Sequence, residues 1–122
     1  MTLSAFMLLA VVGVADAQSM RAGGQTANAR RGFGASVAIS GGMIFVGESA
    51  NQRTSGFVYA YSRDDSGAWS EAAKLASPDA ETGDGFGAAL AVDGGTLVTA
   101  SAGADGGLGA VYVYSADSDT WS

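Results

Sequence analysis

The sequence predicts an all-β fold made of two consecutive copies of one antiparallel unit, and three observations support this. Residues 32–62 align with residues 85–115 without a gap, and 12 of the 31 positions are identical. Each copy contains short runs of alternating residues, which is the period of a β-strand. A glycine pair follows the first run of each copy, where a tight hairpin needs residues that accept a positive φ. A long repeat of this kind is typical of a propeller or another array.

The first copy, residues 32–84, predicts four strands, at 35–39, 43–46, 57–61 and 69–75. The second strand is apolar at four successive positions, so both of its faces should be covered. The third places Phe57, Tyr59 and Tyr61 on one face, because side chains alternate along a strand. The fourth is polar enough for a solvent-exposed outer edge protected by charge.

The second copy, residues 85–122, repeats this order, with strands expected at 88–92, 96–101 and 110–114 and a glycine-rich loop before the last of them. A fourth strand should begin at Trp121-Ser122, so we expect this copy to lack most of its outer strand. Sheets with two apolar faces must be packed between neighbours, and a propeller achieves this by radial repetition. The predicted architecture is therefore a partial β-propeller of two four-stranded blades, the second incomplete.

The N-terminal residues 1–17 are interpreted as a signal peptide. An apolar run from Ala5 to Val14 is too short for a membrane span and precedes Ala15-Asp16-Ala17, a small-x-small pattern for signal peptidase. An apolar N-terminal strand or helix, or a misassigned start, is the alternative. Residues 18–31 have no apolar period and are expected to form a flexible leader. The mature chain would then begin at Gln18 and be secreted, periplasmic or extracellular, without a membrane span.

Composition narrows the possible functions. The chain has 12 acidic and 6 basic residues, so it lacks the basic surface of a nucleic-acid-binding protein. It contains no cysteine and no histidine, which excludes disulfides and any Ser-His-Asp or Cys-His site within this chain. We therefore assign no catalytic, cofactor-binding or metal-binding residue and expect a chain that is not an enzyme.

Several clusters have a functional and a structural interpretation. Asp79, Glu81 and Asp84 could form a weak calcium or substrate site, but their oxygens fall short of a full calcium shell, which favours a solvated acidic turn. Residues 83–87 resemble a phosphate loop only superficially, because such a loop opens a helix and these glycines lead into a strand. The repeated tyrosines are interpreted as packing between blades in preference to stacking on a ligand: Tyr59, Tyr61, Tyr112 and Tyr114. Trp69 and Trp121 are interpreted as anchors of the edge strands in preference to binding platforms. Asp64-Asp65 is most simply a turn pair.

The repeated motifs resemble the FG-GAP repeat of integrin-alpha-type β-propellers. Phe33-Gly34 and Phe86-Gly87 stand at the head of each unit, and the matching part of each copy closes with a Gly-x-Val-Tyr-x-Tyr strand. Segments 47–49 and 100–102 stand where the family has Gly-Ala-Pro. Family members often carry an Asp- and Asn-rich calcium loop between the first two strands of a blade, whereas this chain has only short glycine turns there. We therefore expect no dedicated calcium site.

The resemblance implies a secreted, non-catalytic module for protein or glycan binding, adhesion or scaffolding. The alternatives are a fragment of a larger secreted hydrolase or lyase whose catalytic groups lie outside this chain, and a decayed paralogue without a role of its own. Family propellers close with about seven blades, and this chain has fewer than two complete ones. We expect one face of each blade to remain uncovered, exposing side chains such as Val37, Phe57 and Val113. Uncovered apolar faces usually bind another surface, so the chain should associate with itself or with further blades.

Overall fold

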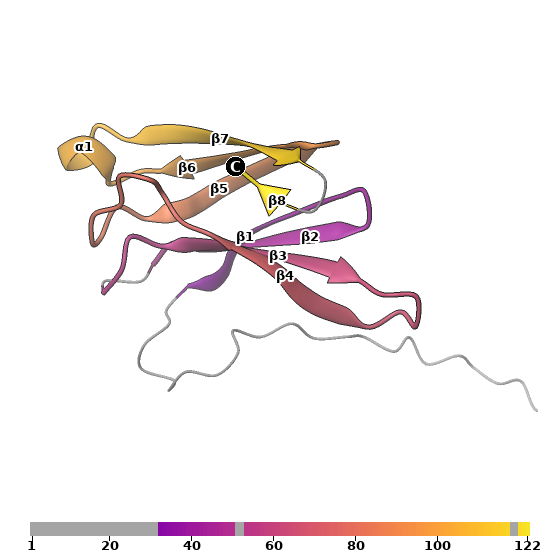
Figure 1. Ribbon diagram of the computed structural model, residues 1–122. Helices are drawn as coiled ribbons and strands as arrows, with labels where there is room; N and C mark the ends of the chain where they lie inside the picture. Colours follow the sequence, from indigo (N-terminus) through magenta and orange to yellow (C-terminus); the bar gives the residue numbers. More distant parts are fainter. Residues whose placement is uncertain (1–31, 51–52, 118–119) are drawn as a thin grey trace, which may run out of the picture.

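The computed structural model describes residues 32–50, 53–117 and 120–122. The expected signal peptide, residues 1–17, and the leader, residues 18–31, lie outside this part. The described chain forms two antiparallel sheets stacked face to face (Figure 1). The first sheet contains β1 (Phe33–Ser40), β2 (Met43–Glu48), β3 (Phe57–Arg63) and β4 (Trp69–Leu75). The second contains β5 (Phe86–Asp93), β6 (Thr96–Ser101), β7 (Ala110–Asp117) and the two-residue β8 (Thr120–Trp121).

Both sheets are simple meanders in which each strand pairs with the next one along the chain. The predicted all-β architecture of two four-stranded units is thus confirmed, including the outermost position of β4 and the short last strand. The turn between β1 and β2 consists of Gly41 and Gly42, both at positive φ, and Ser40 pairs directly with Met43 across it. These glycines allow a two-residue reversal that other residues adopt with difficulty.

The structure differs from the predicted strand limits at the head of each unit. β1 starts at Phe33 and β5 at Phe86, two residues before the predicted starts. The pairing register shifts between Phe33 and Ser36, and again between Phe86 and Ala89. Each Phe-Gly dipeptide therefore forms a β-bulge, with its glycine at a φ of 92° (Gly34) or 89° (Gly87).

The glycine-rich loop between β6 and β7 folds into a single helical turn, α1 (Ala104–Gly107). Asp105 and Gly106 within this turn have left-handed backbone angles. Aspartate tolerates this conformation better than most side chains do, because its short polar side chain can bond locally. This turn is a compact connection between β6 and β7 and not a helix around which a core packs.

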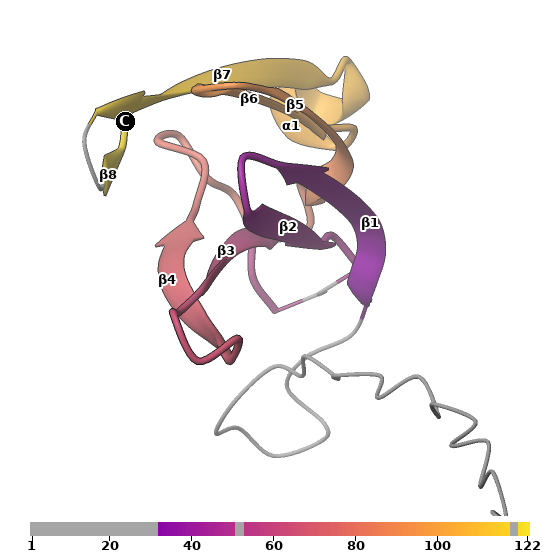
Figure 2. The ribbon, with the colours of Figure 1, turned by 90° about the vertical axis from the view of Figure 1, so that its right-hand side faces the viewer.

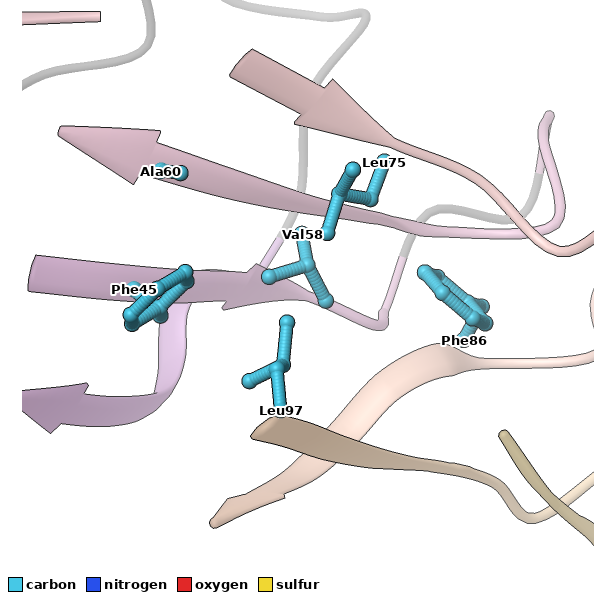
Figure 3. Packing of buried hydrophobic residues seen from close by; sticks show 6 residues of the cluster. All are labelled: Phe45, Val58, Ala60, Leu75, Phe86 and Leu97. Atoms are coloured by element: carbon cyan, nitrogen blue, oxygen red, sulfur yellow. The ribbon is translucent and has the colours of Figure 1, made fainter. Parts of the chain in front are cut away.

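The core lies between the two sheets (Figure 2), where β5 packs against β1 and β2. Its fully or nearly buried members come from both sheets (Figure 3): Phe45, Val58, Ala60, Leu75, Phe86 and Leu97. Residues of β5, β7 and β8 complete it from the second sheet, among them Leu90, Tyr112 and Trp121. Burial of these side chains supplies the main driving force that holds the sheets together.

Glycines bring the backbones of the two sheets into direct contact. A side chain at Gly47 would overlap the carbonyl oxygen of Gly87, and one at Gly87 would lie 2.7 Å from the carbonyl oxygen of Phe57. The Phe86 N–H donates to the Ser55 carbonyl at 2.7 Å, and the Ser36 hydroxyl donates to the Gly87 carbonyl at 2.6 Å. The junction is therefore defined by main-chain atoms as well as by apolar side chains.

A second apolar cluster lies on the opposite face of the first sheet. It contains Val46, Tyr59 and Tyr61, with Phe33 and Trp69 among its half-buried neighbours. The prediction that all four repeated tyrosines pack between blades is thus wrong for Tyr59 and Tyr61 in this chain, because strand alternation turns them away from the second sheet. Their counterparts Tyr112 and Tyr114 do face the first sheet.

Candidate functional site

The three acidic residues of the linker come together around one hollow. Asp79, Glu81 and Asp84 line a space of about 230 Å³ together with Asp105 of α1. Sequence reasoning grouped the first three and missed Asp105, which lies in the loop between β6 and β7. The Asp-Gly-Gly turn signal at 105–107 was visible in the sequence, but nothing in it indicated which linker the turn would face.

Asp84 serves the local fold. It is almost fully buried, and its Oδ2 accepts a hydrogen bond from the Glu81 N–H at 2.9 Å. Its own carbonyl accepts hydrogen bonds from the Gly103 N–H at 2.7 Å and from the Ser101 hydroxyl at 3.0 Å. Asp84 therefore ties the linker to the end of β6, which accounts for its burial without a ligand.

Asp79 is engaged in a similar way. Its Oδ1 accepts hydrogen bonds from the Ser77 hydroxyl at 2.6 Å and from the Tyr112 hydroxyl at 2.7 Å. These two bonds, that of Ser77 foremost, lower the pKa of Asp79 below its ordinary value. Over the described ranges 32–50, 53–117 and 120–122, no three acidic side chains are grouped closely enough to hold a metal ion. The hollow is best described as an acidic turn closed by hydrogen bonds.

Glu48 is a buried carboxylate that sequence reasoning did not single out. Its side chain is fully enclosed at the end of β2, and Tyr59 donates a hydrogen bond to its Oε2 at 3.0 Å. The corresponding residue of the second copy is Ser101, which is also buried and hydrogen-bonded. Both positions anchor the end of the second strand of a blade, so Glu48 supports the aromatic cluster of the first sheet.

The Asp64-Asp65 pair is a turn, as the sequence predicts. The Asp64 Oδ1 accepts hydrogen bonds from the Ser66 hydroxyl at 2.6 Å and from the N–H groups of Ser66 and Ala68, each at 2.9 Å. These bonds, with the Ser66 hydroxyl as the largest cause, lower the pKa of Asp64. The arrangement closes the hairpin between β3 and β4 and leaves Asp65 in solvent.

Four of the large exposed apolar side chains lie on two sheet faces, and another, Leu108, follows α1 and is 89% exposed. Val37 is 66% and Ile39 is 69% exposed on β1, on the face of the first sheet that points away from the second. Val111 and Val113 are 66% and 63% exposed on β7, on the opposite side of the molecule. We call the first surface the outer face and the second the far face. The predicted exposure of Val37 and Val113 is confirmed, whereas Phe57 is half-buried under the Lys74 ammonium group, 3.7 Å from the ring centre.

The far face is hollowed. A shallow apolar depression of about 150 Å³ lies over β5, β6 and β7, and its lining includes Ala89, Ala91, Val98, Ala100 and Val111. Alternating strand geometry places these residues opposite the ones that pack on the first sheet. The depression is large enough to receive an aliphatic side chain.

The two tryptophans occupy equivalent strand positions with different surroundings. Trp121 of β8 packs edge-on against Phe45 of the first sheet, with ring centres 5.1 Å apart at 85°. Trp69 starts β4 and belongs to the cluster on the outer face. The expected role as edge anchors is met by both, and Trp121 also joins the two sheets.

Two stacked four-stranded meanders whose equivalent strands repeat in order define the class of propeller-type repeat proteins. The family comparison is consistent with this class: residues 69–114, from β4 to β7, match the FG-GAP repeat family. No curated protein and no solved structure matches the chain. No helix of the described segments is long and apolar enough to cross a membrane.

Proposed function

We propose that the chain is an exported, non-catalytic propeller module that acts by binding protein through its two uncovered sheet faces. The observation that carries this proposal is the exposure of four large aliphatic side chains on regular strands: Val37, Ile39, Val111 and Val113. Apolar faces on paired strands can pack against another sheet, and contiguous apolar surface on a soluble protein marks interaction sites.

The aromatic residues favour protein over glycan as the partner. A glycan platform needs an aromatic ring open to solvent, whereas Tyr59 and Tyr61 are buried in the outer-face cluster. The Tyr112 hydroxyl is bound to Asp79, and the Tyr114 hydroxyl donates to the Ala76 carbonyl at 2.7 Å. The proposal of a non-catalytic role is supported by the structural hydrogen bonds that occupy Asp79 and Asp84.

Site-specific photocrosslinking in the native cells tests this function. A photoreactive residue at position 111 should capture protein, whereas the same residue at the exposed linker position 80 should capture much less, because Ala80 lies on neither face. Mass spectrometry of the adducts identifies the captured chains. Equal yields at positions 111 and 80, or adducts with carbohydrate alone, would contradict a protein-binding face.

Export is tested separately by the mass of the product. Cleavage after Ala17 predicts a chain that begins at Gln18 and is recovered outside the cytoplasm. Recovery of a cytoplasmic chain that retains Met1 would refute export without affecting the proposed binding faces.

A further inference from the structure

We propose that the partner of the far face is the outer face of a second copy of this chain, joined head to tail. This inference rests on the proposed function and specifies its partner. The molecule already contains one example of the required contact. In that internal contact, the second sheet presents one face of its repeat to the opposite face of the first sheet.

The far face repeats the surface that receives the second sheet inside the chain. With the repeat alignment, the receiving residues of the first sheet correspond one by one to far-face residues of the second. The first set is Ser36, Ala38, Phe45, Gly47, Val58 and Ala60. The second set is Ala89, Ala91, Val98, Ala100, Val111 and Val113. The far-face set is entirely small or aliphatic and uncharged, as a packed surface requires.

The outer face repeats the surface that the second sheet presents to the first sheet inside the chain. Leu90 and Val92 of β5 pack against the first sheet, and their counterparts on β1 are Val37 and Ile39, the two exposed residues of the outer face. Leu97 of β6 is fully buried in the internal contact, and its counterpart Ile44 is only half-buried. The apolar character is kept at each of these positions, so the same packing can form between two chains.

The apolar depression on the far face fits this arrangement. In the internal contact β5 lies on β1 and β2, so in the proposed contact β1 of one copy lies on β5 and β6 of the other. That position is the apolar depression of about 150 Å³ lined by Ala89, Ala91, Val98 and Ala100. The Val37 and Ile39 side chains would fill it, which removes apolar surface from water on both copies.

Head-to-tail contacts produce closed rings when the rotation between copies closes, and open chains when it does not. Propellers commonly contain about four to eight blades, so a ring built only from these two-blade units would close with about two to four of them. The contact uses different surfaces on the two partners, which sets it apart from a two-fold symmetric dimer.

Two lysine substitutions test the proposal on the full chain, at an ionic strength near 0.15 M where repulsion between acidic chains is screened beyond about 8 Å. Val37→Lys blocks the outer face, and Val111→Lys blocks the far face. Both residues are highly exposed, so neither change should disturb folding. Ala80→Lys makes the same change of charge in the linker and serves as the matched control.

Sedimentation velocity should show discrete oligomers for the unmodified chain and for Ala80→Lys, and monomers for each face variant. An equimolar mixture of Val37→Lys and Val111→Lys should form a two-chain complex and nothing larger, because one intact far face meets one intact outer face. Oligomers that persist in either variant, or an equimolar mixture that stays monomeric, would overturn the proposal. A monomeric unmodified chain whose position 111 crosslinks to a different protein would overturn it too, while leaving the proposed function intact.

Discussion

The two sheets share one apolar pattern, but they pack against each other with opposite sides of it. Val58 and Ala60 of β3 are fully buried, whereas their counterparts on β7, Val111 and Val113, are largely exposed. On the other side of the strands, Leu97 is buried and its counterpart Ile44 is only half-buried. The difference teaches that burial in a repeat is assigned by the neighbour that a face meets, because the residues themselves are nearly interchangeable.

Two glycines give the sharpest test of this comparison. Gly34 and Gly87 are equivalent, with φ values of 92° and 89°, but only Gly87 touches the other sheet. Alanine at either position incurs the cost of a positive φ, about 1–2 kcal/mol. Gly87→Ala should lose about 1–3 kcal/mol more, because its Cβ would press on the Phe57 carbonyl and the Gly47 backbone. Chemical denaturation measures both, and equal losses would show that the junction tolerates a side chain.

The equivalent valines give the next largest effect. Val58→Ala should destabilise the chain by about 2 kcal/mol, because it removes two buried methyl groups and leaves a cavity between the sheets. Val111→Ala should change the stability by less than about 0.5 kcal/mol when the chain is dilute enough to be monomeric. Denaturation at matched low concentration compares the two, and a similar loss at both positions would mean that the far face is covered in the monomer.

Thr99 and Val46 occupy the same position in the two sheets, and at this position the second sheet carries the less stabilising residue. The Thr99 hydroxyl is buried and finds no hydrogen-bond partner among the described residues. Thr99→Val removes this uncompensated polar group at nearly constant shape and should stabilise the chain by about 1 kcal/mol. The reverse change, Val46→Thr, is the control and should destabilise it. A loss of stability in Thr99→Val would reveal a bond that the hydroxyl makes in solution.

The two tyrosine pairs differ in where their partners lie, and pH makes this difference measurable. Tyr59 bonds to Glu48 of its own sheet, whereas Tyr112 bonds to Asp79 of the linker. Because folding lowers the pKa of Asp79, the folded state gains stability above the ordinary value of 3.8 and loses it as the pH falls through the lowered pKa. The stability advantage over Asp79→Asn should therefore shrink as denaturation is repeated at successively lower pH. An advantage that stays constant would show that the bond does not depend on the charge of Asp79.

The repeat predicted the architecture because its turn and strand signals are local in the sequence. The glycine pairs, the alternating strands and the polar β4 each follow from residues close together in the chain, and all are found in the structure. The bulges at Phe33-Gly34 and Phe86-Gly87 were missed, since a bulge depends on pairing with the next strand.

The side of each sheet that packs against the other was harder to predict from the sequence. Alternation shows that Tyr59 and Tyr112 lie on the same side of their sheets, but both sides of each strand are apolar, so it does not show which side meets a neighbour. The acidic hollow was predicted only in part for a similar reason, because Asp105 reaches it through tertiary packing of a distant turn.

The meander topology has a consequence for the order in which the chain matures during synthesis. Every strand pairing joins neighbours in sequence, so the hydrogen bonds of the first sheet can form as soon as residue 75 has left the ribosome. Its inner face, with Phe45 and Val58, is covered only when Phe86 and Leu97 have also emerged. During that interval the nascent chain presents an apolar sheet to its surroundings, and such surface is prone to associate with other molecules.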